Sequence, residues 1–271
     1  MRSLLLHTHD DPNFEARLQV ALDIARRCDA HLTLLQAIAY DVVLPGDYSG
    51  MLSANMIPLM RDAAAAFRAK IEPRLTAEDV RWDWVEEFGM ADSRMMHHAV
   101  LTDLAIVGAS SPEFASRGPS PLAGILAVHC KAPIMVVPDS AHGLDITGPA
   151  VIAWNGSLES ARALRAALPL LRRAASVHLL SVRDPADDYE PELPPLSAAE
   201  YLARHGIECE LVELPRGTRM VDEVLREAAR AREATFMVMG AYGTPRLMET
   251  LFGGVSRAIL TKPDVPLLTA H

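Results

Sequence analysis

The chain contains the same order of short apolar runs and helical segments twice, and this repeat restricts the fold more than any other feature. Each copy has five apolar runs separated by segments with helical periodicity. The runs lie at 4–6, 32–35, 80–85, 104–108 and 133–137, and again at 150–154, 177–182, 209–214, 235–240 and 265–268. Strands that alternate with helices pair in parallel through right-handed crossovers. The sequence therefore predicts an α/β fold with two tandem, doubly wound sheets of five parallel strands.

Matching residues mark equivalent places in the two copies and set the domain boundaries. The pairs are Arg26-Arg27 with Arg172-Arg173, Gly89 with Gly217, Gly108 with Gly240, and Pro133 with Pro266. Between the copies, residues 139–148 are polar, contain glycine and show no periodicity, which is typical of a linker. We expect a first domain at 1–138, a linker at 139–148 and a second domain at 149–271.

The second copy carries a glycine pattern after its fourth apolar run. Gly240 and Gly243 stand at the end of that run, and Gly253-Gly254-Val255-Ser256 follows within a helical pattern. Glycine lets the backbone turn sharply and approach a ligand closely. A helix that begins after such a turn directs its free N–H groups at the same place, which suits a phosphate. The pattern therefore indicates a turn that binds phosphate.

The spacing Gly-x-x-Gly, nine residues, then Gly resembles the motif of nucleotide-binding universal stress proteins, and the likeness extends over nearly the whole chain in tandem form. The resemblance implies strand order 3-2-1-4-5 in each half, with ATP or a related adenine nucleotide bound in the second half. Gly254 stands where the family has serine or threonine, and Asn155 stands where it has an aspartate that contacts the nucleoside. The candidate binding residues are Asn155, Gly240, Gly243, Gly253, Gly254, Val255 and Ser256.

The first half lacks this pattern and is predicted to be a degenerate structural partner that does not bind nucleotide in the family's way. Ser111 occupies the place of the second glycine, and Ile125 follows Gly124 where the family has a hydroxyl residue. His9, or Asp10 with a shift of one residue, stands at the position of the family's aspartate.

A structural interpretation of the same residues leads to a different function. Asn155-Gly156-Ser157 is also typical of a turn followed by a helix cap. The glycines are also suited to close packing of a helix on a strand. On this interpretation the protein is a nucleotide-free scaffold or partner-binding module of the same fold, and its loops at 40–58 and 183–195 are the candidate interaction surfaces.

Composition and charge argue against several classes of function. The formal net charge of -9 disfavours a nucleic-acid partner, and no apolar stretch approaches the roughly 20 residues of a membrane helix. The cysteines, Cys28, Cys130 and Cys209, are isolated in sequence, which favours a reducing cytoplasm. The histidines do not form a set with metal-ligand spacing, and neither a nucleophile elbow nor a P-loop motif occurs.

These observations together predict a cytoplasmic stress-response protein that is not an enzyme, or that at most hydrolyses ATP slowly. Its expected ligand is ATP or a related adenine nucleotide in a regulatory role, with no catalytic residue and no metal. A second copy of the chain or another protein is the expected type of macromolecular partner, and the sequence leaves the oligomeric state open.

Overall fold

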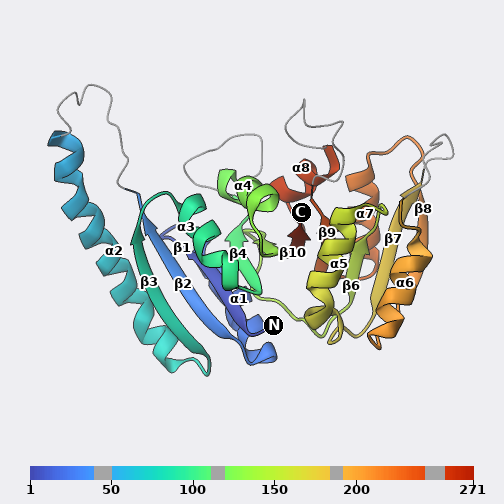
Figure 1. The fold of residues 1–271 in the computed structure, drawn as a ribbon, viewed down its shortest axis with the longest axis horizontal. Coiled ribbons are helices and arrows are strands. Elements are labelled where there is room, and N and C mark those ends of the chain that lie inside the picture. Colours follow the sequence, from blue (N-terminus) through green and yellow to red (C-terminus); the bar gives the residue numbers. More distant parts are fainter. Residues whose placement is uncertain (40–50, 111–119, 184–191, 242–253) are drawn as a thin grey trace.

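The computed structural model describes residues 1–39, 51–110, 120–183, 192–241 and 254–271, with side chains from residue 56 onward in the second of these ranges. Within these ranges, ten strands form one sheet in the order β3-β2-β1-β4-β5-β10-β9-β6-β7-β8. Figure 1 shows the two halves side by side, with β10 near the middle and the edge strands β3 and β8 toward the two sides.

The elements of the two halves follow the predicted alternation of strands and helices. The first half consists of β1 (Ser3–Thr8), α1 (Phe14–Cys28), β2 (His31–Ile38), α2 (Met51–Ala77), β3 (Arg81–Phe88), α3 (Ala91–His98), η1 (Ala99–Leu101), β4 (Leu104–Gly108), α4 (Pro121–His129) and β5 (Ile134–Val137). The second half consists of β6 (Ala150–Ala153), α5 (Leu158–Leu171), β7 (Val177–Arg183), α6 (Pro195–Arg204), β8 (Glu210–Pro215), α7 (Val221–Ala231), β9 (Phe236–Gly240), α8 (Gly254–Thr261) and β10 (Leu267–Ala270).

The predicted strand order 3-2-1-4-5 is confirmed in each half, and all pairs within a half are parallel. The two sheets are not separate, however, because β5 and β10 pair antiparallel, with Met135 opposite Leu268. This pairing satisfies backbone groups that would otherwise lie at two exposed sheet edges. The result is one continuous sheet with its strand direction reversed at the centre.

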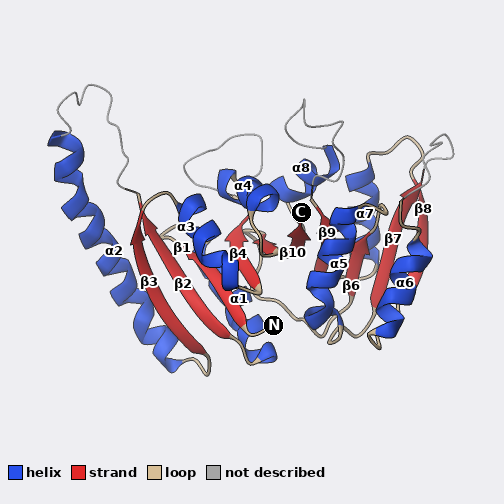
Figure 2. Cartoon of the chain, in the orientation of Figure 1, coloured by secondary structure: helices blue, strands red, loops and turns tan. Residues whose placement is uncertain are grey.

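Each face of the sheet carries an apolar layer that runs through both halves. Successive strand residues point to opposite faces. Leu4 and Leu6 therefore join the layer that contains α1, α2, α5 and α6, while Leu5 joins the layer that contains α3, α4, α7 and α8. Figure 2 shows the strands as the central layer between these helices.

Residues 139–148 contain neither a helix nor a strand. They are nevertheless packed onto the molecule. Leu144 and Ile146 are buried in the layer that contains α1 and α5, and the Leu144 N–H donates to Asp23 Oδ2 over 2.9 Å. The connection therefore fastens the two halves to each other.

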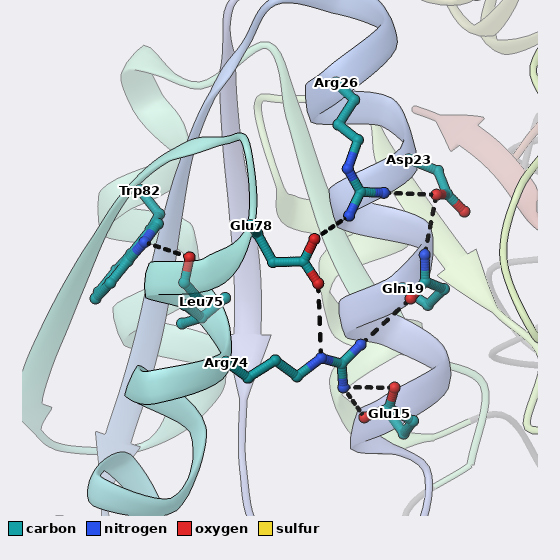
Figure 3. A network of polar contacts seen from close by, with 8 residues as sticks. All are labelled: Glu15, Gln19, Asp23, Arg26, Arg74, Leu75, Glu78 and Trp82. Atoms are coloured by element: carbon teal, nitrogen blue, oxygen red, sulfur yellow. Dashed lines mark hydrogen bonds and ion pairs between the residues drawn. The ribbon is translucent and has the colours of Figure 1, made fainter.

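The two halves differ most in their second helix, because α2 has 27 residues and α6 has 10. A polar network holds the C-terminal part of α2 against α1 (Figure 3). Glu78 forms ion pairs with Arg26 of α1 and with Arg74, and Arg74 also pairs with Glu15. The network fixes α2 as a wall beside the carboxyl ends of the first-half strands.

Candidate functional site

Ligands of open parallel sheets bind at the carboxyl ends of the strands, where the strand order reverses. In this fold that point lies between β1 and β4 in the first half, and between β6 and β9 in the second. Leu4 pairs with Leu104, and Ala150 pairs with Phe236. Counting from these pairs places the following residues at equivalent positions: His9 and Asn155, Thr8 and Trp154, Asp11 and Ser157, and Arg17 and Ala163.

Asn155 lies at the predicted place, exposed and two residues beyond the end of β6. Its Oδ1 accepts a hydrogen bond from the Ser157 N–H over 3.2 Å. Ser157 Oγ in turn accepts from the Ser160 N–H over 3.2 Å and caps α5. These contacts are those of a turn and a helix cap, while the Asn155 side-chain amide forms no hydrogen bond within the described part of the chain.

Gly240 ends β9 directly beneath the start of α5. A Cβ atom at this position would lie 2.4 Å from the Ser160 nitrogen and 2.6 Å from the Glu159 carbonyl carbon. Such separations are far below van der Waals contact, so any larger residue would push the helix away from the strand. Close packing of α5 on β9 therefore explains why position 240 is glycine.

The remaining second-half candidates surround the start of α8. Gly254 is exposed, and a Cβ atom there would meet no atom within 4 Å. Val255 is half-buried and packs against the apolar layer under α7 and α8, and Ser256 is half-buried beside it. Gly243 and Gly253 lie outside the described residues.

The sequence analysis overlooked Trp154, which it treated only as the last residue of a strand. Trp154 is buried, and its Nε1–H donates to the Leu193 carbonyl over 3.0 Å. The Leu193 N–H donates back to the Gly156 carbonyl over 3.1 Å. A buried aromatic residue next to a strand end is thus tied to a segment far along the chain, and it fills space at the end of β6.

The first half has a cleft of about 520 Å³ at the corresponding edge. Its polar wall contains His7, His9, Asp10, Asp11 and Arg17, which lie on β1, on the turn after it and on α1. Its apolar wall comes mainly from α2 and α4. The volume is in the range of small-molecule sites.

A buried ion pair forms part of this cleft. Arg17 donates from Nη1 to Asp11 Oδ1 over 3.0 Å and from Nη2 to Oδ2 over 2.5 Å. The two side chains are only 3% and 5% exposed. Burial alone would raise the pKa of Asp11, but hydrogen bonds from His9 and Arg17 outweigh it and hold that pKa well below its ordinary range. Asp11 is therefore ionised at neutral pH, and Arg17 neutralises it.

His7 remains uncharged beside this pair. Burial lowers the pKa of His7 to about 3, and the positive charge of Arg17 adds to the effect. The His7 and His9 rings are stacked with their centroids 6.3 Å apart. No group of three or more side chains that could hold a metal ion occurs in the described ranges.

Residues 148–271 match the model of the universal stress protein family, so the second half is similar to that family in sequence. The whole chain has the fold of a universal stress protein from Archaeoglobus fulgidus DSM 4304, with a TM-score of 0.75 at 16% identity, covering 99% of this chain and 96% of that one.

A second solved universal stress structure, from Pseudomonas aeruginosa UCBPP-PA14, has a TM-score of 0.57 at 16% identity and covers 100% of this chain and 93% of that one. At these identities the likeness shows the tandem universal stress fold alone. No curated protein matches the chain. Within the described residues, no helix is long and apolar enough to cross a membrane.

The universal stress family match and the cleft lie in different halves. The match covers the half that carries the glycine motif, whereas the cleft of about 520 Å³ lies in the half predicted to be degenerate. In that half, Gly124 is buried within α4, Ile125 lines the cleft, and Ser111 lies outside the described residues. The two halves therefore need separate functional hypotheses.

Proposed function

We propose that the second half of this chain binds ATP or a related adenine nucleotide as a regulatory ligand, in a cytoplasmic stress response. The site comprises the seven predicted residues: Asn155, Gly240, Gly243, Gly253, Gly254, Val255 and Ser256. The observation that carries the proposal is that the family match coincides with the half in which the glycine motif follows β9. No catalytic residue is assigned.

The described geometry is compatible with this role at both ends of a nucleotide. The amide of Asn155 is exposed at the strand-order reversal, and a side-chain amide can donate to a ribose oxygen or an adenine nitrogen. The unobstructed backbone at Gly254 leads into α8, and N–H groups at the start of a helix favour phosphate. Gly240 contributes by letting α5 pack closely.

Substitutions at Gly254 test the proposal with little expected effect on the fold, because a Cβ atom there would meet no atom within 4 Å. Calorimetric titration with ATP would compare the original chain with three variants. Gly254→Asp places a carboxylate where phosphate would bind, and like charges repel, so affinity should fall at least about tenfold. Gly254→Asn, of the same size but uncharged, is the matched control and should weaken binding much less.

Gly254→Ser restores the hydroxyl that the family motif has at this position, and should tighten ATP binding by adding a side-chain donor to phosphate. Equal ATP affinities for the Asp and Asn variants would show that phosphate does not bind at the start of α8. Absence of ATP binding both in the original chain and in Gly254→Ser would reject the proposal as a whole.

The second candidate function is a nucleotide-free scaffold or partner-binding module. Two observations favour it: packing of α5 explains Gly240, and the turn engages Asn155 Oδ1. Under this hypothesis the three Gly254 variants all lack measurable ATP affinity and keep the stability of the original chain, or exceed it where Asp or Ser improves the start of α8.

A further inference from the structure

We propose that the cleft in the first half binds a small organic cation with an apolar body, and not a phosphorylated ligand. The proposal rests on the described residues of this cleft and is independent of nucleotide binding in the second half. Two properties of the cleft support it: its apolar walls and the sign of its unpaired charges.

The apolar walls face each other across the cleft. Met60 and Phe67 of α2 line one side, and Leu122 and Ile125 of α4 line the other. Phe67 is buried and meets Phe14 edge-on, with ring centroids 5.0 Å apart, so its position is fixed. Such walls take up the body of a small molecule by removing apolar surface from water.

The unpaired charges of the cleft are negative. Among its described lining residues, Asp10, Asp11 and Asp92 are acidic, and the basic residues are Arg17, His7 and His9. His9 adds at most one positive charge, so the carboxylates remain in excess. Asp11 and Arg17 neutralise each other, and His7 is uncharged at neutral pH. Asp10 is exposed with no hydrogen bond or ion pair in the described part of the chain, and Asp92 accepts only from the adjacent Ser93 N–H.

This arrangement disfavours an anion. A phosphate in the cleft would meet two unpaired carboxylates, while the guanidinium that could compensate is engaged by Asp11. Opposite charges attract and like charges repel by amounts that increase as water is excluded. An ammonium group beside either Asp10 or Asp92 has the complementary sign.

Arg17 is held in place and does not offer its charge to a guest. Its Nε is buried and has no acceptor within the described part of the chain. Gly108 leaves room for the guanidinium, because a Cβ atom in its place would lie 3.0 Å from Arg17 Nη1.

Three probes of one scaffold separate charge from shape: 2-amino-1-phenylethanol is a cation, 1-phenyl-1,2-ethanediol is neutral, and mandelate is an anion. Each has a phenyl ring and a benzylic hydroxyl. We expect the affinity of the full-length protein, measured by titration with NMR detection, to be about tenfold higher for the amine than for mandelate, with the diol between them. Equal affinities, or mandelate binding best, would overturn the assignment of charge.

The charge assignment is tested further by Asp10→Asn combined with Asp92→Asn. This variant should reduce the preference for the amine over the diol to about twofold or less. Glu208→Gln combined with Glu233→Gln is the matched control, because it also removes two units of negative charge, from exposed residues outside the cleft. If the control lowers amine affinity as much as the Asp10 and Asp92 variant does, the cleft carboxylates are not the recognition groups.

The location is tested by Ile125→Trp, which fills the cleft from a half-buried position on α4 and changes no charge. A folded variant, judged by its circular dichroism, should lose at least about tenfold in amine affinity. Unchanged amine affinity in this variant, or no amine binding by the original chain at millimolar concentration, would refute the proposal. Gly254→Asp should leave amine binding unchanged, because it lies in the other half. The amine test therefore remains valid even if the second half does not bind nucleotide.

Discussion

The two halves place different groups over the same strand end. In the first half, the side chain of Arg17 lies over Gly108, with Nη1 3.0 Å from where a Cβ would be. In the second half, the backbone of α5 itself lies over Gly240, with the Ser160 nitrogen 2.4 Å from the equivalent point. The same strand end is thus covered in two ways. In the first half an ion pair covers it and leaves a cleft beside it, whereas in the second half a closely packed helix covers it.

Side-chain size at two equivalent positions accounts for this difference. Arg17 and Asp11 of the first half correspond to Ala163 and Ser157 of the second, and all four are largely buried. Alanine lets α5 approach β9, whereas a guanidinium paired with a carboxylate needs space between α1 and β4. The glycines at the two strand ends therefore have different roles, although they occupy equivalent places in the repeat.

The largest effect is expected from removing one partner of the ion pair. Arg17→Ala leaves Asp11 buried without its counter-charge, and such a change typically lowers the free energy of unfolding by about 3–5 kcal/mol. Denaturant unfolding at neutral pH measures this. The control is the double variant Asp11→Ser with Arg17→Ala, which copies the second half and removes both charges.

The double variant should regain at least about 2 kcal/mol relative to Arg17→Ala, because no isolated charge remains buried. If the double variant is as unstable as Arg17→Ala, packing by the arginine side chain matters more than charge, and the electrostatic side of the comparison fails.

A pair of alanine substitutions tests the two kinds of contact directly. Gly240→Ala forces a methyl group against the backbone of α5, which cannot move without disturbing the helix, and should cost about 2–3 kcal/mol of unfolding free energy. Gly108→Ala meets the side chain of Arg17, which needs to shift by only a few tenths of an ångström, and should cost less than about 1 kcal/mol. If both variants lose the same free energy of unfolding, in thermal or denaturant unfolding, close contact with helix backbone would not be specific to Gly240.

The repeat made the topology of each half predictable, whereas the sheet junction was not. Short apolar runs alternating with helices predict parallel strands, and the resemblance to universal stress proteins implies the order 3-2-1-4-5. Residues 134–137 and 267–270 have the composition of any buried strand, and nothing in them distinguishes a parallel from an antiparallel neighbour. The continuous sheet forms because the edge strands β5 and β10 meet in space. The local sequence pattern of each strand does not encode that meeting.

The first-half cleft escaped prediction for a related reason. Arg17 lies within an otherwise apolar helix face, six residues after Asp11, but only the turn between β1 and α1 brings the two together. Glycine spacing indicates close backbone approach in the second half, but it carries no information on cavities between side chains. Asn155 lies two residues beyond β6 in sequence, so knowing that strand is enough to locate Asn155 at the strand-order reversal.

His7 should make the stability of the first half depend on pH, whereas the equivalent residue of the second half, Ala153, does not titrate. The folded-state pKa of His7, about 3, is below its ordinary value of 6.5, so the unfolded chain binds the proton more readily between these values. Stability therefore falls as the pH falls below about 6.5. Because His7 is half-buried, we expect a loss of about 1 kcal/mol between about pH 7 and 5, below the limit of about 1.4 kcal/mol per pH unit.

His7→Ala should remove that loss, and His142→Ala, at an exposed position, should retain it. Asp11 acts in a separate window, because its pKa is lowered from 3.8 and its contribution is lost only as the pH falls below that value. An unaltered pH profile in His7→Ala would show that His7 is no more desolvated than an exposed histidine.

The smallest effect concerns the wall that α2 provides to the cleft and that α6, a shorter helix, does not provide in the second half. Glu78 joins Arg26 of α1 to Arg74 of α2, and these side chains are 22–35% exposed. Glu78→Gln should therefore lower the free energy of unfolding by only about 0.5–1 kcal/mol, and added salt should diminish the loss. Glu208→Gln, an exposed change in the second half, should cost nothing measurable.

Amine binding to the same Glu78→Gln variant shows what positions the α2 wall of the cleft. If amine binding weakens while stability hardly changes, the polar network holds α2 in the position that the ligand requires. If amine binding is unchanged, apolar packing of Phe67 and Leu75 alone positions the wall.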